Sequence, residues 1–284
     1  DPETGLDLPT LDAFPVTLLR VAHEDEEFWI AIREEKGGVD HINPFFQGSD
    51  GMVLPLTDPE RPVTRIETLP TYDTPELEDR VQLRAQVQTA GSARLSFRMH
   101  LRGNQAERLM ERIESVPQEQ IPMVYRQMAV SMFPGASDVD GRIDQVGDES
   151  IIGLEMTLAR ACDVDEEKIE CRSLVLSNPL VPILAALPER TYPLMLQMPI
   201  IRRLELEIVE PPGWVLQDRP ERRLDTQWGS VSEILEREAN NLRSVLSIEL
   251  PSQNVATGDY RTFARFCQAV DELTTRPPTL VPAG

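Results

Sequence analysis

The chain has 284 residues, which is long enough for two domains that each bury a hydrophobic core. Its 48 acidic and 28 basic residues give a formal net charge of -20, which repels nucleic-acid phosphates and anionic lipid headgroups. No apolar run approaches the roughly 20 residues that span a bilayer. We therefore expect no nucleic acid as a partner and no direct membrane insertion by this segment.

The first elements are expected within residues 14–35, where two apolar stretches flank an acidic turn. A short apolar strand is expected at residues 52–56. The proline-rich stretch at residues 55–75 then indicates a connection between domains. We accordingly predict a first domain over residues 1–58 and a second over residues 59–284.

An antiparallel hairpin is predicted near the start of the second domain. Apolar and polar side chains alternate over residues 81–87 and again over residues 95–101. Such alternation is typical of a sheet with one buried face, so the odd-numbered side chains are expected to point inward. His100 has an even number and is therefore expected to face solvent.

Two helices in tandem are predicted to follow, over about residues 104–133. Apolar residues recur there at helical spacing, and Asn104 is a candidate N-cap. Pro117 and Pro122 mark the break between the two helices.

Strands return in the last part of the chain, before a closing helix at about residues 259–273. The alternating stretch at 151–158 is expected to form a hairpin with a returning strand at 169–176. Three further strands are expected at residues 204–209, 231–238 and 242–250. The predicted fold class is therefore α+β and β-rich, with antiparallel sheets in a sandwich-like arrangement and the helices packed on them.

The cysteines allow two interpretations. Cys162 and Cys171 flank a charged turn and share the inward parity of their strands, so their Cβ atoms could come within reach of a disulfide. Two small buried hydrophobic side chains explain them equally well, which leaves the bond open. Cys267 falls on the apolar stripe of the closing helix, where a buried thiol is inert.

No metal or cofactor site is predicted. Residues 137–144 and 163–167 place acidic side chains two apart, as calcium loops do. Neither stretch supplies the full pattern of ligands, glycine and bidentate glutamate, so both are predicted to be solvated turns. The three histidines have no common spacing typical of a metal site.

Several short motifs follow one another in a particular order. Phe14-Pro15-Val16 precedes an apolar strand, Trp29 to Ile32 follows a turn, and Phe46-Gln47-Gly48 comes later. Met-Phe-Pro-Gly-Ala, Pro-Pro-Gly-Trp, Trp-Gly-Ser and Tyr-Arg-Thr-Phe-Ala-Arg-Phe then occur in the remainder. This order resembles the C-terminal part of bacterial cell-envelope proteins that carry a transglutaminase-like core followed by a β-rich domain of unknown function.

The resemblance also implies that catalysis has been lost. Transglutaminase-like cores use a Cys thiolate that is activated by a His, which an Asp orients. Val16 stands at the His position and Ala31 at the Asp position, and neither side chain can accept a proton. Residues 1–58 are therefore expected to be a degenerate remnant of such a core, without enzymatic activity.

The function expected is that of a non-catalytic structural or protein-binding module of an exported protein in the periplasm or cell envelope. The sequence begins with neither Met nor a signal peptide, so we expect a longer polypeptide. The partner would be another envelope protein or the upstream domains of the same polypeptide. The alternative is an accessory domain of an active transglutaminase-like cysteine peptidase whose catalytic Cys lies upstream.

Overall fold

In the computed structural model the described residues are 17–23, 26–31, 46, 48, 50–53, 65–70, 78–146, 149–176, 179–196, 198–217, 221–238 and 241–283. The chain forms two compact units, Asp1–Thr74 and Pro75–Gly284. The domain boundary predicted after residue 58 lies outside the described residues and stays a prediction.

The first unit contains two antiparallel hairpins. Their strands are β1 (Leu18–His23), β2 (Glu26–Ala31), β3 (Asp50–Val53) and β4 (Arg65–Thr68). Arg20 on β1 forms ion pairs with Glu27 on β2 and with Glu67 on β4, the latter at 2.7 Å. The two strands predicted on either side of the acidic turn are therefore confirmed, and a shared arginine connects the hairpins.

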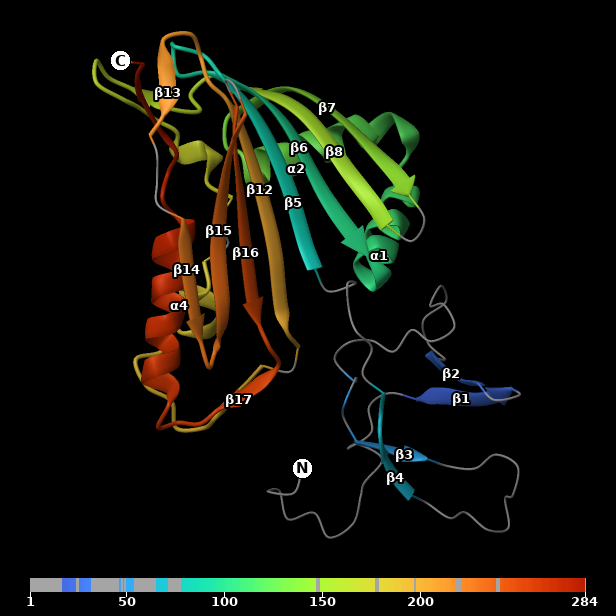
Figure 1. Ribbon diagram of the computed structural model, residues 1–284. Coiled ribbons are helices and arrows are strands. Elements are labelled where there is room, and N and C mark those ends of the chain that lie inside the picture. Colours follow the sequence, from blue (N-terminus) through green and yellow to red (C-terminus); the bar gives the residue numbers. More distant parts are fainter. Residues whose placement is uncertain are drawn as a thin grey trace. The chain divides into compact units, whose positions relative to one another are not determined.

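An eight-stranded sheet forms the frame of the second unit (Figure 1). Its strands lie in the order β14 (Arg222–Thr226), β15 (Gly229–Glu238), β16 (Asn241–Leu250), β12 (Ile200–Val209), β5 (Glu78–Val87), β6 (Ala93–Arg102), β8 (Glu149–Leu158) and β7 (Ala136–Val146). The four strands at each end pair antiparallel, and the two halves meet where β12 pairs parallel to β5. We call this parallel pair the seam. The seam corrects the expectation that the sheets are antiparallel throughout. The strands β5 and β12 run in the same direction because a long crossover connection lies between them in the sequence.

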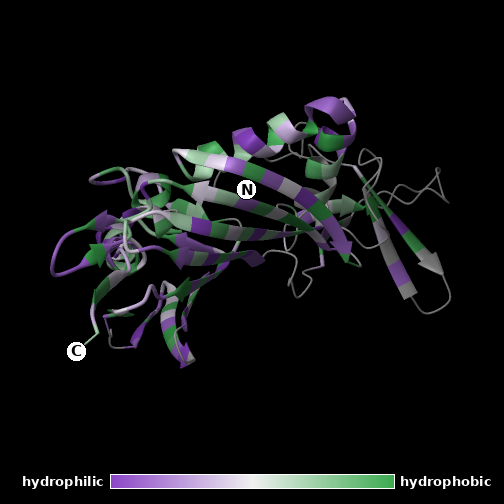
Figure 2. Cartoon of the chain, turned by 90° about the horizontal axis from the view of Figure 1, so that it is seen from above, coloured by the Kyte–Doolittle hydropathy of each residue, from purple (hydrophilic) through white to green (hydrophobic). Residues whose placement is uncertain are grey.

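The predicted register of β5 and β6 is confirmed. Leu83 lies opposite Phe97 and Ala85 opposite Leu95, and these side chains are buried on what we call the inner face of the sheet. The even-numbered side chains point to the opposite, outer face. Hydrophobic and hydrophilic residues accordingly alternate along the strands in Figure 2. A slip by one residue would expose the whole apolar set, which is why the register is firm.

Two helices cover the inner face of the first half of the sheet. The tandem helices predicted there are confirmed as α1 (Gly103–Glu114) and α2 (Ile121–Met132). Asn104 is not the N-cap, because α1 starts directly from the end of β6 with Arg102 at the cap position. The core beneath includes an edge-to-face contact of Phe97 with Phe133, at 5.7 Å between ring centroids.

The closing helix, α4 (Tyr260–Thr274), forms a second core with β15 and β16. Its buried stripe carries Phe263, Cys267 and Val270, as the spacing predicts. A short helix, α3 (Val181–Leu184), packs beside α4. The Asp271 carboxylate of α4 accepts hydrogen bonds from the backbone amides of residues 180 and 181, at 2.6 and 2.9 Å.

Smaller sheets complete the unit. A four-stranded sheet has the order β13 (Trp214–Leu216), β18 (Thr279–Pro282), β10 (Ile169–Glu170) and β9 (Asp163–Val164), and β11 (Leu194–Leu196) pairs with β17 (Gln253–Val255). Side chains of β10, β13 and β18 belong to the same core as the inner face of the large sheet. The predicted β-rich α+β class is confirmed. Among the described residues, no helix is long and apolar enough to span a bilayer.

Two local predictions are wrong. Residues 151–158 do not pair with the segment at 169–176, because β8 pairs with β6 and β7, and the returning segment turns into a 3-10 helix after two strand residues. Residues 137–144 are part of the edge strand β7 rather than a turn. The charged residues of this stretch are exposed, because β7 pairs with a strand on one side only. An edge strand of this kind has the same acidic, polar sequence as a solvated turn.

Candidate functional site

The two positions of the degenerate catalytic pair lie at the limit of what the structure describes. Val16 is outside the described residues. Ala31 is the last residue of β2, and its backbone pairs with that of Leu18. The side chain of Ala31 is not among those described. The assignment of these two positions therefore stays a prediction.

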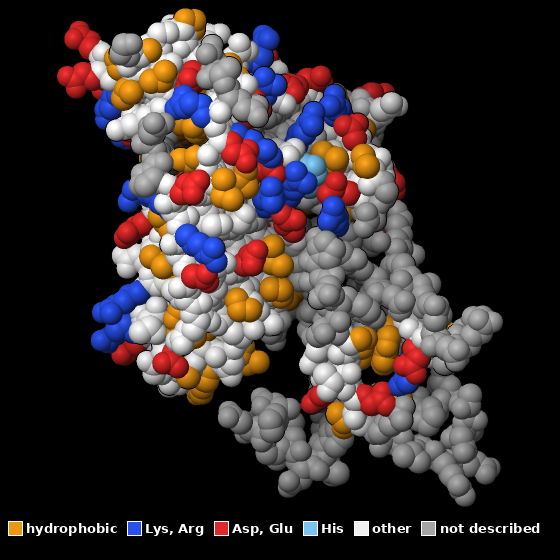
Figure 3. Space-filling view, viewed as in Figure 1, with side chains coloured by type: hydrophobic (Ala, Val, Ile, Leu, Met, Phe, Trp, Pro, Cys, Tyr) orange, Lys and Arg blue, Asp and Glu red, His pale blue; other side chains and the backbone are white. Residues whose placement is uncertain are grey.

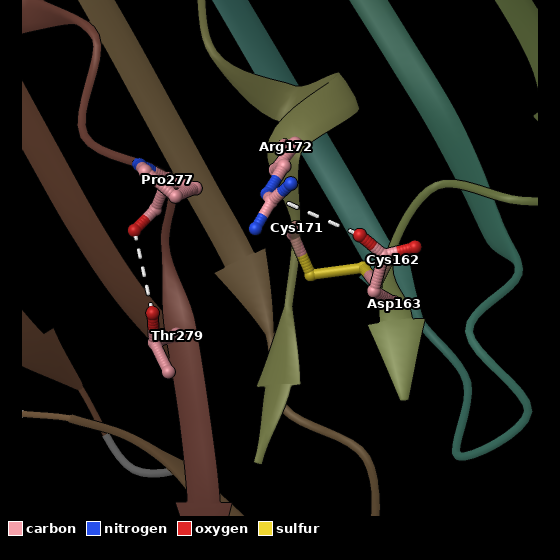
Figure 4. Close-up of a disulfide and its surroundings, with 6 residues drawn as sticks. All are labelled: Cys162, Asp163, Cys171, Arg172, Pro277 and Thr279. Atoms are coloured by element: carbon pink, nitrogen blue, oxygen red, sulfur yellow. Dashed lines mark hydrogen bonds and ion pairs between the residues drawn. A yellow bond between two sulfur atoms is a disulfide. The ribbon is translucent and has the colours of Figure 1, made fainter. Parts of the chain in front are cut away.

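The structure joins Cys162 and Cys171 by a disulfide (Figure 4). The two residues flank the short β9–β10 hairpin, their Cα atoms are 3.9 Å apart, and both side chains are buried. An ion-pair contact at 4.0 Å between Asp163 and Arg172 lies beside the bond. The thiols are thus consumed in a structural cross-link of the small sheet.

Cys267 is the one free cysteine of the chain and is fully buried in the second core. Burial raises the pKa of its thiol to about 12, and the neighbouring Asp271 carboxylate contributes in the same direction. Since the thiolate is the nucleophilic form, this side chain is inert at neutral pH. Among the described residues, no three Cys, His, Asp or Glu side chains gather as metal ligands do.

The outer face of the large sheet carries most of the charged interactions of the second unit. Figure 3 shows Arg, Asp and Glu side chains close together over the strands of the seam. The helices α1 and α2 lie on the other side of the sheet, as Figure 1 shows. The outer face is therefore the charged face of the large sheet, and the helices α1 and α2 leave it uncovered.

Glu205 is at the centre of this charged network. Its carboxylate accepts hydrogen bonds from Arg243 at 2.8 Å, Arg203 at 3.0 Å and Gln82 at 3.1 Å, and Arg80 lies 3.1 Å away. Burial of Glu205 alone would raise its pKa, but the hydrogen bonds and the charge of Arg80 outweigh this and lower the pKa to about 2. The network joins residues of β5, β12 and β16 and so crosses the seam.

His100 is not solvent-facing as predicted. Its side chain is 11% exposed, its Nδ1 lies 3.2 Å from Glu149, and its Nε2 lies 3.2 Å from Gln82. Arg102 approaches the same glutamate at 3.2 Å. Strand parity places His100 on the outer face correctly, but polar side chains from β5 and β8 cover it. The sequence gives no signal for this, because those neighbours come from other strands.

Three exposed arginines lie together on the outer face of β5 and β6, and we call them the arginine row: Arg84, Arg94 and Arg98. Arg84 is opposite Ser96, so it is diagonal to both other members, at a spacing of about 7 Å. Arg84 pairs loosely with Glu207 at 3.5 Å, while Arg94 and Arg98 form no ion pair with a described residue. Glu155 of β8 also faces Ser96, so carboxylates flank the row on both sides.

Planar guanidinium groups at this spacing can bind carboxylates through two parallel hydrogen bonds. Although the whole chain is acidic, charges more than about 8 Å apart are largely screened at physiological salt. The charges that matter close to the row are therefore its three guanidinium groups and the flanking carboxylates of Glu155 and Glu207. The side chains of the row are hydrogen-bond donors that stay charged at neutral pH.

Comparison with known proteins connects part of this unit to a family. Residues 172–278 match the model of a family described as a domain of unknown function with a solved structure, DUF3858. The matched part contains the strands β12, β14, β15 and β16 of the large sheet and the helix α4. Glu205 and Arg243 lie on these strands. It does not contain β5 or β6, and so excludes the arginine row. No curated protein matches the chain.

A similar solved structure is the crystal structure of a candidate protease from Parabacteroides distasonis. It has a TM-score of 0.34 and 17% sequence identity, and the alignment covers 42% of this chain and 24% of that protein. The aligned part is thus about a quarter of that protein's length. A similarity of this size says nothing about the activity of the present chain.

Proposed function

We propose that this chain is a non-catalytic, protein-binding module of an exported bacterial envelope protein with a degenerate transglutaminase-like core. The observation that carries the proposal is the outer face of the large sheet, where the arginine row is exposed beside a tightly held charged network. The buried Cys267 thiol and the side chains at Val16 and Ala31 support the absence of catalysis.

The partner would present carboxylates to the arginine row. It would be another envelope protein or an upstream domain of the same polypeptide. The Cys162–Cys171 disulfide supports an oxidising compartment such as the periplasm, because cytosolic thiols are kept reduced. Binding would involve a rigid surface, because strand pairing on both sides fixes the backbone of β5 and β6.

Charge reversal of the arginine row tests the binding surface. We expect Arg94→Glu combined with Arg98→Glu to weaken binding of an extended glutamate-rich peptide by at least about tenfold, because two attractive contacts become repulsive. The measurement is fluorescence anisotropy of the labelled peptide at low and physiological salt. The matched control is Arg223→Glu on the far edge strand β14, and equal affinities for both variants would refute the surface assignment.

The absence of catalysis is tested separately. Incubation with amine donors and with glutamine-containing or other peptide substrates is expected to give no turnover, and a thiol-reactive probe is expected to leave Cys267 unmodified in the folded protein. Turnover that disappears on Cys267→Ser would contradict the proposal. A catalytic Cys with a His and an Asp in the upstream sequence would instead favour the accessory role in an active peptidase.

A further inference from the structure

Two cavities adjoin each other on the inner face of the large sheet. The first, which we call the leucine cavity, has a volume of about 70 Å³ and lies over β12, β15 and β16, with Leu206 in its wall. The second, the seam cavity, has a volume of about 220 Å³ and lies over β5, β6 and β12, with Val81 in its wall. Residues of α4 line both cavities on the side away from the sheet. The cavities meet at three side chains that belong to the lining of both: Leu176, Leu204 and Thr274.

Both cavities lie between the two hydrophobic cores of the second unit. Leu83 of β5 belongs to the core beneath α2, and Ile248 of β16 belongs to the core beneath α4. The strand β12 lies between β5 and β16, and its inner-face side chains Leu204 and Leu206 are only half-buried. Leu83, which is opposite Leu206 across the seam, is 1% exposed. Leucines at the centre of the sheet therefore keep apolar surface that faces the cavities.

The charged side chains around the cavities already have partners. Asp79 and Arg202 pair with each other at 3.8 Å, and each makes a further interaction. The Asp271 carboxylate accepts hydrogen bonds from two backbone amides at the start of α3, and Glu233 accepts one from the Ser244 hydroxyl at 2.9 Å. The other titratable residues of the walls also have partners: Arg80, His100 and Arg276. What the cavities offer to a ligand is therefore their apolar surface.

The lining and the length of the cavities match a single unbranched hydrocarbon chain. Among the described residues no Phe, Tyr or Trp lines either cavity, so a flat aromatic ligand would find no ring to stack on. The cavities together cross five neighbouring strands from β15 to β6, and at about 4.8 Å between strands this is a path of roughly 19 Å. One leaflet of the hydrocarbon core of a bilayer is about 15 Å thick, so the path is long enough for one lipid acyl chain.

We propose that the two cavities bind the unbranched hydrocarbon chain of a single-chain amphiphile, of the kind represented by a fatty acid. The chain would lie against Leu206 and Val81 at its two ends and pass between Leu176 and Leu204, while the polar head stays outside. Each buried methylene group should strengthen binding about fourfold, so the affinity should depend on chain length. The site is on the face opposite to the arginine row, and the proposal does not depend on protein binding by that row.

The test compares octanoate, decanoate and dodecanoate, all below the concentrations at which they form micelles. Binding to the full chain is measured by isothermal titration calorimetry. We expect each step of two methylene groups to strengthen binding at least about tenfold. The compact apolar anion 1-adamantanecarboxylate is expected to bind at least about tenfold more weakly than dodecanoate. Equal affinities for octanoate and dodecanoate, or for dodecanoate and 1-adamantanecarboxylate, would overturn the proposal, as would no saturable binding of dodecanoate up to about 1 mM.

A second comparison tests whether the chain or the polar head is recognised. Dodecylphosphocholine carries the same chain on a phospholipid head, and it is also used below its micelle concentration. We expect its affinity to be within about threefold of that of dodecanoate, because the charged groups of the walls already have partners. A difference of tenfold or more between the two ligands would contradict recognition through the chain alone.

Substitutions locate the binding event. Leu204→Phe narrows the point where the cavities meet and is expected to weaken dodecanoate binding at least about tenfold, and Leu206→Phe in the leucine cavity is a second variant with the same expectation. The matched control is Leu187→Phe, which makes the same change at a side chain that is 53% exposed and lines neither cavity. Circular dichroism shows whether each variant is folded. A folded Leu204→Phe or Leu206→Phe protein that binds dodecanoate like the wild type would refute the location.

Discussion

Replacing Glu205 by Gln is expected to lower the free energy of unfolding of the second unit by about 3 kcal/mol, because a charged partner of several buried or half-buried groups is lost. The Glu205 side chain is 6% exposed and faces Arg80, Arg203 and Arg243. Without its charge, three guanidinium groups are left close together without their shared carboxylate. The measurement is urea unfolding followed by circular dichroism.

The matched control is Asp225→Asn on the edge strand β14. Asp225 forms an ion pair with Arg223 at 2.8 Å, but its side chain is 59% exposed. We expect a loss of less than about 1 kcal/mol there, because solvent screens an exposed pair. Equal losses for Asp225→Asn and Glu205→Gln would contradict the central role of Glu205.

The same carboxylate makes a pH-dependent contribution to stability. The folded-state pKa of Glu205 is about 2, against an ordinary value of 4.5. A lowered pKa means that the contribution is fully present above pH 4.5 and is lost as the pH falls from 4.5 towards about 2. The difference in unfolding free energy between the wild type and Glu205→Gln should therefore shrink across this window. A difference that stays constant across it would refute the assignment.

Removing the disulfide is expected to have an effect of similar size. Cys162→Ala together with Cys171→Ala should lower the free energy of unfolding by about 3 kcal/mol, the value for a cross-link that closes a short loop. Alanine is chosen because both positions are buried and tolerate no new unpaired hydroxyl group. The measurement is denaturant unfolding of exported protein with and without reductant.

The control is Cys267→Ala, which removes a buried sulfur without removing a cross-link. We expect it to cost less than the double substitution and to leave the response to reductant unchanged. Reduced wild-type protein should approach the stability of the double variant. Detection of three free thiols by mass spectrometry of the folded, exported protein would contradict the bond.

Local periodicity is sufficient to predict much of the second unit. The register of Leu83 with Phe97 follows from alternation on two consecutive strands, and the stripe of α4 follows from helical spacing. The parallel seam does not follow from any local pattern, because Gln82 and Glu205 come together across 123 residues. For the same reason the sequence identifies neither the partners of Glu205 nor the burial of His100.

The candidate site shows the same limit. Strand parity places the members of the arginine row on the outer face. It cannot show that Arg94 and Arg98 form no ion pair with a described residue there while Arg80 pairs with Glu205. The positions at Val16 and Ala31 come from resemblance to a family rather than from chemistry visible in the residues themselves.

The parallel seam also determines the order in which the second unit can fold. Each half of the sheet contains two hairpins, β5–β6 and β7–β8 in one half and β14–β15 and β15–β16 in the other. Hairpins form on the microsecond scale, whereas the seam must close a loop of more than 100 residues. We therefore expect the pairing of β5 with β12 to be the slowest of the sheet's strand pairings to form. Until it occurs, β5 and β12 are open edges with apolar inner faces, so the nascent chain is most vulnerable to aggregation along this line.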